Sequence, residues 1–137
     1  MNLKVRLRWF AVACLAALAF AATALAAGSS LKVHAPKSVK LTKHYTVKVS
    51  GKASGHANFV VGWEVAGHKC KSNYAAEYHF LANPTSAPVS QSVTGPFSFT
   101  AGFTAAHTGK AYFCAYLINQ TTTHTYKHAF KHWKEHK

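Results

Sequence analysis

The sequence predicts an all-β fold, an antiparallel β-sandwich of about seven strands, with a small β-barrel as the main alternative. Apolar and polar residues alternate with a period of two in several segments, which is typical of strands that bury one face. Turn residues separate these segments roughly every 8–12 residues, as in known sandwiches. No window of about 15 residues before the C-terminal tail has the apolar spacing of an amphipathic helix, so we expect little helix.

The N-terminal segment has the features of a secretory signal peptide. The basic residues Lys4, Arg6 and Arg8 precede an apolar run from Trp9 to Ala27, and Ala24-Leu25-Ala26 supplies a small-x-small cleavage pattern. We expect residues 1–26 to be removed, with an uncleaved anchor as the alternative. In both cases the rest of the chain would be secreted or held in the cell envelope.

The part of the chain after residue 26 is long enough for one domain. It has 111 of the 137 residues, with 13 lysines, no arginine and three glutamates, so its formal charge is +10. We predict the sandwich over residues 27–130 and a short basic, histidine-rich tail over residues 131–137.

The first half of this domain contains four alternating segments. They are Leu31–Ala35, Val39–Leu41, Tyr45–Val49 with Gly51 at its end, and Phe59–Val65. In the fourth segment, alternation places Trp63 in the predicted core and Glu64 on the solvent side.

The second half begins with a predicted helical turn over residues 72–78, which Ser72 or Asn73 can cap. Two prolines then predict a loop over residues 82–88. Four further strands are expected at Val89–Val93, Phe97–Phe103, Lys110–Ile118 and Thr122–Phe130. Because Lys110–Ile118 is almost wholly apolar, it should be a central strand that is covered on both faces. Phe97, Phe99 and Tyr112 complete the predicted core.

The acidic residues are too few for most catalytic sites. Glu64, Glu77 and Glu135 are the only ones, and there is no aspartate. This excludes a Ser-His-Asp triad and an acidic calcium or magnesium cluster. Glu64 and Glu77 could pair as acid and base, but an outward-facing Glu64 and an ion-paired Glu77 are the simpler interpretation. We therefore predict a protein that is not an enzyme.

Two cysteines, Cys70 and Cys114, remain after the signal peptide. In an exported chain, two thiols most often form one disulfide. Two buried free thiols, or a zinc site completed by histidines, are the alternatives, although no CxxC spacing supports zinc. A disulfide that closes a loop of about 45 residues would stabilise the fold by roughly 4 kcal/mol.

The strand around Cys114 resembles the sixth strand of immunoglobulin-like domains, in which a tyrosine precedes the cysteine by two positions. Tyr112 and Cys114 match those two positions. The resemblance implies that the Tyr112 hydroxyl bonds back to the backbone. The other cysteine departs from the antibody pattern, because Cys70 follows the core tryptophan Trp63 instead of preceding it.

The chain also resembles small exported proteins of actinobacteria and their relatives. The matching segments are Ser38–Thr42, Val47–Gly51, Cys70–Glu77, Gly95–Phe99 and Cys114–Leu117. This resemblance covers about 90 residues and implies an immunoglobulin-like sandwich outside the cytoplasm. It implies no active site.

Histidine is unusually frequent, and four of the ten histidines recur at every fourth position. They are His124, His128, His132 and His136. On a helix, two imidazoles four residues apart can chelate one zinc, copper or nickel ion. If these residues form a strand, the same histidines are too far apart to share a metal. We expect no cofactor, with weak binding of a divalent transition metal as the alternative function.

The C-terminal residues combine positive charge with an aromatic ring, as some membrane- and polymer-binding segments do. The candidate contact residues are Lys127, Lys131, Trp133, Lys134 and Lys137. The predicted partner is an anionic cell-envelope polymer or membrane surface, which electrostatic attraction would hold.

Sequence-specific nucleic-acid binding is not expected, because the exported part has no arginine for bidentate contacts. Since histidine gains a proton below pH ~6.5, acidification should strengthen polyanion binding.

Overall fold

A computed structural model describes residues 28–78 and 88–137. The predicted signal peptide and all but the last residue of the predicted 82–88 loop lie outside the described residues. In the described residues, no helix is long and apolar enough to cross a membrane.

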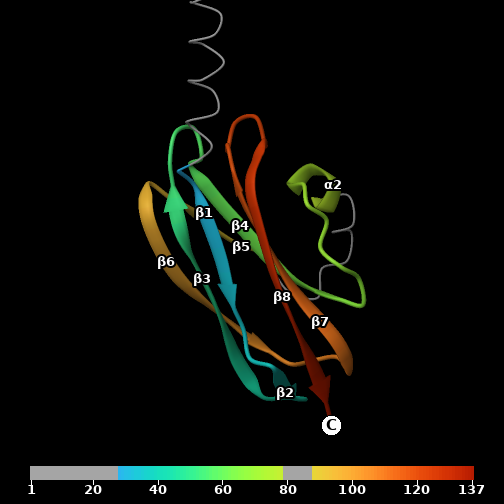
Figure 1. The fold of residues 1–137 in the computed structure, drawn as a ribbon. Helices are drawn as coiled ribbons and strands as arrows, with labels where there is room; N and C mark the ends of the chain where they lie inside the picture. The colour runs from blue at the N-terminus through green and yellow to red at the C-terminus, as the bar shows by residue number, and fades with distance from the viewer. Residues whose placement is uncertain (1–27, 79–87) are drawn as a thin grey trace, which may run out of the picture.

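The described chain forms two sheets that face each other, which confirms the predicted β-sandwich (Figure 1). The first sheet, in spatial order, contains β1 (Ser30–His34), β3 (His44–Ala53) and β6 (Gly95–Thr104). The second contains β2 (Ser38–Lys40), β8 (Thr125–His136), β7 (Gly109–Ile118), β4 (Phe59–Ala66) and β5 (Val89–Ser92). Neighbouring strands are antiparallel except for β2 and β8, which are parallel.

The space between the sheets is filled by the alternating residues of β3 and by the inner faces of β6 and β7. Val47 and Val49 are fully buried there, together with Phe113 and Leu117 of β7. Phe97 and Phe99 also face this core, as predicted, but they are half-buried because β6 is at the edge of its sheet.

A second apolar cluster lies on the outer face of the five-stranded sheet. Trp63 of β4 and Tyr112, Cys114 and Tyr116 of β7 form most of it. The prediction that Trp63 and Tyr112 are buried is therefore confirmed, but their side chains lie on the outer face of the five-stranded sheet and not between the two sheets. The faces of β4 are reversed relative to the sequence prediction, and this places Glu64 between the sheets.

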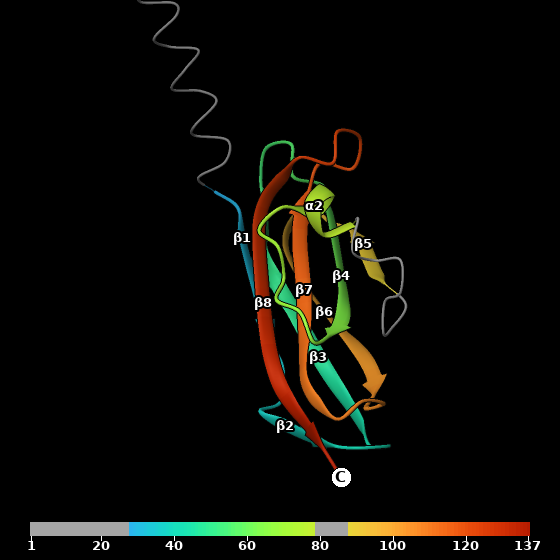
Figure 2. The ribbon, with the colours of Figure 1, turned by 90° about the vertical axis from the view of Figure 1, so that its right-hand side faces the viewer.

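The described part of the connection that follows β4, residues 67–78, covers this outer cluster. Figure 2 shows it passing over β7 to α2 (Tyr74–Tyr78). The side chain of Asn73 caps α2, because its Oδ1 accepts a hydrogen bond from the backbone N–H of Ala76 at 3.3 Å. The predicted helical turn is thus confirmed. Its position over the sheet buries β7 on both faces, as the apolar run of that strand predicted.

The predicted disulfide between Cys70 and Cys114 is present. It joins the connection to β7, with 5.5 Å between the two Cα atoms. The expected backbone hydrogen bond of Tyr112 is made by another tyrosine. Tyr116, two residues after Cys114, donates its hydroxyl proton to the carbonyl of Lys71 at 2.5 Å.

The predicted boundary at residue 130 is wrong, because the last strand runs without interruption to His136. Residues 131–135 pair with β7, and Lys134, Glu135 and His136 also pair with β2. The expected tail is therefore the second half of an internal strand of the five-stranded sheet. This buries Trp133 between the sheets, where it packs against Tyr45 with 5.2 Å between ring centroids.

Candidate polyanion-binding surface

The charged side chains are divided between the interior and the exterior of the protein. Glu64, Glu77 and Glu135 are 3%, 0% and 1% exposed, respectively. All 13 lysines of the described residues are exposed. The described surface therefore presents ammonium groups and no side-chain carboxylate.

Two of the carboxylates lie between the sheets and are held by neutral donors. The hydroxyl of Tyr45 donates to Oε2 of Glu64, so the expectation that Glu64 is solvated is wrong. Glu135 accepts hydrogen bonds from Trp133 Nε1 at 3.2 Å and from the backbone N–H of His107 at 3.0 Å. A buried carboxylate is tolerated only with such partners.

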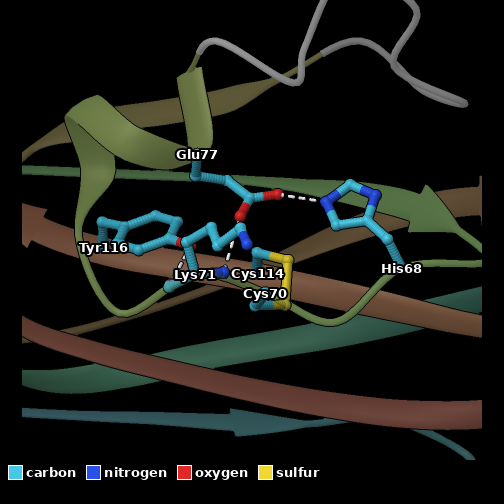
Figure 3. A network of polar contacts seen from close by, with 6 residues as sticks. All are labelled: His68, Cys70, Lys71, Glu77, Cys114 and Tyr116. Atoms are coloured by element: carbon cyan, nitrogen blue, oxygen red, sulfur yellow. Dashed lines mark hydrogen bonds and ion pairs between the residues drawn. A yellow bond between two sulfur atoms is a disulfide. The ribbon is translucent and has the colours of Figure 1, made fainter.

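The third carboxylate, that of Glu77, organises the connection over the outer face (Figure 3). Its Oε1 is 2.6 Å from Nε2 of His68, and its Oε2 accepts a hydrogen bond from the backbone N–H of Lys71, also at 2.6 Å. The structure thus places a basic side chain, His68, beside Glu77, as the predicted ion pair requires. Burial and the nearby charge of Glu77 raise the pKa of the Tyr116 hydroxyl, which therefore stays protonated and keeps donating to the Lys71 carbonyl.

The outer face of β8 carries a row of polar and aromatic side chains. This row consists of every second residue of the strand, namely His128, Phe130, His132 and Lys134. Phe130 is 48% exposed. Tyr112 of β7 packs against both Phe130 and His132. Successive members of this row are about 7 Å apart, because a strand rises roughly 3.4 Å per residue.

Two open pockets lie along β8, and Phe130 lines one of them while His132 lines the other. The first, of about 350 Å³, lies between β1 and β8 and includes Lys32, His34, His128 and Lys131. The second, of about 510 Å³, lies at the other end of the strand and is lined by Lys37, Gly109, Lys110, His132, Trp133 and Lys134. We call the exposed lysines and histidines of these two pockets the cationic edge.

The cationic edge includes only some of the contact residues that were predicted from the sequence. Lys131 and Lys134 belong to it, and Lys127 and Lys137 are exposed nearby on β8 and at the chain end. Trp133 was expected to contact the partner, but it is only 1% exposed. Phe130 is the exposed aromatic residue of the strand.

Four members of the cationic edge were not predicted from the sequence as contact residues. They are Lys32, His34, Lys37 and Lys110. They are distant from β8 along the chain, and they reach it because β2 and β7 pair with β8 and β1 packs beside it. Only the strand order brings them together, and no local sequence signal reveals that order.

The histidines do not have the helical spacing on which the metal prediction depended. His128, His132 and His136 lie on β8, and His124 precedes it. Residues four apart on a strand are separated by roughly 13 Å, so neighbouring pairs cannot chelate one ion. Residues 28–78 and 88–137 contain no group of three or more His, Cys, Asp or Glu side chains that could hold a metal.

Comparison with solved structures finds this fold in a domain from an archaeon. The solution NMR structure of the CARDB domain of PF1109 from Pyrococcus furiosus aligns with a TM-score of 0.50 and 15% identity, covering 79% of this chain and 94% of that one. A crystal structure of the same domain in complex with di-metal ions gives a TM-score of 0.47 and 12% identity, covering 78% and 91%. No protein-family model matches the chain, and no curated protein matches it. At 15% identity, the match to the NMR structure supports only the fold, which is an immunoglobulin-like β-sandwich.

Proposed function

We propose that the protein is a non-enzymatic, exported immunoglobulin-like domain, of the kind found in small actinobacterial exported proteins, that binds an anionic polymer outside the cytoplasm. The observation that carries the proposal is the separation of charge. The lysines of the described residues are all exposed, whereas Glu64, Glu77 and Glu135 are buried. An approaching polyanion therefore meets attractive charges from many directions.

The cationic edge is the part of this surface that best suits an extended polymer. Its two pockets lie on one strand, β8, so a chain molecule could contact both. Lys110 and Lys134 lie directly opposite each other on neighbouring strands, which puts their Cβ atoms about 5 Å apart, within the Debye length of about 8 Å at physiological salt. Their fields therefore add. Lysine supplies point charges without the fork of arginine, which supports charge recognition over base recognition.

The compartment is supported by the covalent structure. The Cys70–Cys114 disulfide is consistent with an oxidising environment outside the cytoplasm, and export through the predicted signal peptide would deliver the chain there. The same bond leaves neither cysteine as a thiolate nucleophile. The buried glutamates are engaged in hydrogen bonds within the protein, which supports a binding role over acid–base catalysis.

The proposal is tested by co-sedimentation of the purified protein with isolated envelope polymer. The polymer is used intact and after chemical removal of its anionic chains, each with and without a chelator. Retention should require the anionic chains and should be unaffected by the chelator, because attraction to lysine needs no metal. Equal retention by the stripped polymer would contradict the proposal, and loss of binding in chelator would favour the metal-binding alternative.

A further inference from the structure

We propose that the pocket formed by β7, β8 and Lys37, the residue directly before β2, is a phosphate-binding subsite, at which the protein holds one phosphate group of an anionic polymer. This inference rests on the proposed function and adds to it a defined site and a ligand chemistry. The pocket is the larger of the two on the cationic edge, and it is lined by Lys37, Lys110 and Lys134.

The three lysines are brought together by the pairing of the strands. Lys110 of β7 lies directly opposite Lys134 of β8 in the antiparallel register. Directly opposed residues have their Cβ atoms about 5 Å apart. The backbone N–H of Lys134 donates to the carbonyl of Lys37 at 3.2 Å, which places Lys37 on the other side of the same residue. Three adjacent segments thus each contribute a cation to one pocket.

This arrangement is unfavourable without a ligand. Like charges that face each other across two strands destabilise a sheet, and opposite charges are the usual pairing. Glu135 follows Lys134 in the sequence, but it is buried and bonded to Trp133 and His107. The carboxylate nearest in sequence is therefore engaged inside the sandwich. A bound anion would supply the missing negative charge.

The chemistry of the pocket fits phosphate better than a carboxylate. Lysine binds phosphate as a point charge, whereas bidentate recognition of a planar carboxylate is the speciality of arginine, which the described residues lack. The volume of about 510 Å³ exceeds what one phosphate needs, so the adjoining units of a polymer have room. His132 also lines the pocket, and the Tyr112 ring lies beside two of the lining residues, 6.0 Å from Nζ of Lys110 and 5.6 Å from the His132 ring.

The test is an NMR titration of the purified protein with inorganic phosphate, followed by binding to a phosphate-bearing polymer and to polyglutamate. The variant K110Q/K134Q removes two pocket charges. The matched control K48Q/K52Q removes two exposed charges from β3, in the other sheet. We expect saturable shifts at the amides of Gly109, Lys110 and Lys134. Phosphate affinity should fall at least tenfold in K110Q/K134Q and less than twofold in the control.

The outcomes separate the subsite from the general surface. Equal losses in the two variants, or no saturable shift with phosphate, would overturn the subsite while leaving the polymer-binding function standing. Failure of the unmodified protein to bind either polymer would overturn both. Because K110Q/K134Q removes a repulsion, its urea midpoint should equal or exceed that of the unmodified protein. A lower midpoint would show that the lysines stabilise the sheet, and it would overturn the argument that they serve a ligand.

Discussion

Replacing both bridged cysteines, as C70S/C114A, should lower the free energy of unfolding by about 4 kcal/mol. The bond spans 44 positions of the sequence, so breaking it restores much conformational freedom to the unfolded chain. It also fastens the connection over the outer cluster, where Trp63 is 1% exposed. Urea denaturation monitored by tryptophan fluorescence measures the loss.

Reductant provides the control for this prediction. It should lower the stability of the unmodified protein towards that of C70S/C114A and leave the variant unchanged. A variant as stable as the unmodified protein would show that packing alone holds the connection in place. Where the variant remains folded, its polymer binding should persist, because the lysines of the cationic edge do not lie on the connection.

Replacing Glu77 by alanine should destabilise the protein by about 2–3 kcal/mol. The carboxylate is fully buried and joins His68 to the backbone N–H of Lys71, so its loss leaves a cavity and removes hydrogen bonds in the covering segment. Because His68 is partly exposed, solvent can replace part of the lost contact, so the loss should stay below the roughly 3–5 kcal/mol known for breaking a fully buried pair.

The matched control is E77Q, which keeps the size of the side chain and an oxygen that can accept from the Lys71 N–H. We expect it to cost only about 1 kcal/mol. In both variants the pKa of Tyr116 should fall, because the charge of Glu77 contributes to raising it, although burial will keep it above the ordinary value. Ultraviolet titration of the tyrosines measures this shift. An unchanged titration, or equal stabilities of E77A and E77Q, would contradict the assigned role.

The sequence predicts most strands because alternation is a local property. Val47 and Val49 alternate with polar neighbours, and the structure buries them as expected. The orientation of β4 could not be predicted in this way. Trp63 and Glu64 are both buried, since one face of β4 packs between the sheets and the connection with α2 covers the other. Alternation identifies a strand, but it cannot show which face points inward when both are covered.

The spacing of the histidines is ambiguous for a related reason. Residues four apart share a face on a helix and also on a strand, so His128 and His132 fit both. Pairing with β7 decides between them, and it depends on contacts far along the chain. The pocket that we propose for phosphate depends even more on contacts between distant parts of the sequence, because Lys37, Lys110 and Lys134 meet only through the order β2-β8-β7.

The central claim is that a surface free of side-chain carboxylates binds polyanions by charge. The most direct measurement is the affinity of the purified protein for a phosphate-bearing polymer at salt concentrations from about 0.05 to 0.5 M. Binding that depends on displaced counterions should weaken steadily, with the logarithm of the affinity falling linearly against the logarithm of the salt concentration. We predict a loss of at least tenfold across the series. An affinity that stays constant up to ~0.5 M salt would contradict the electrostatic account.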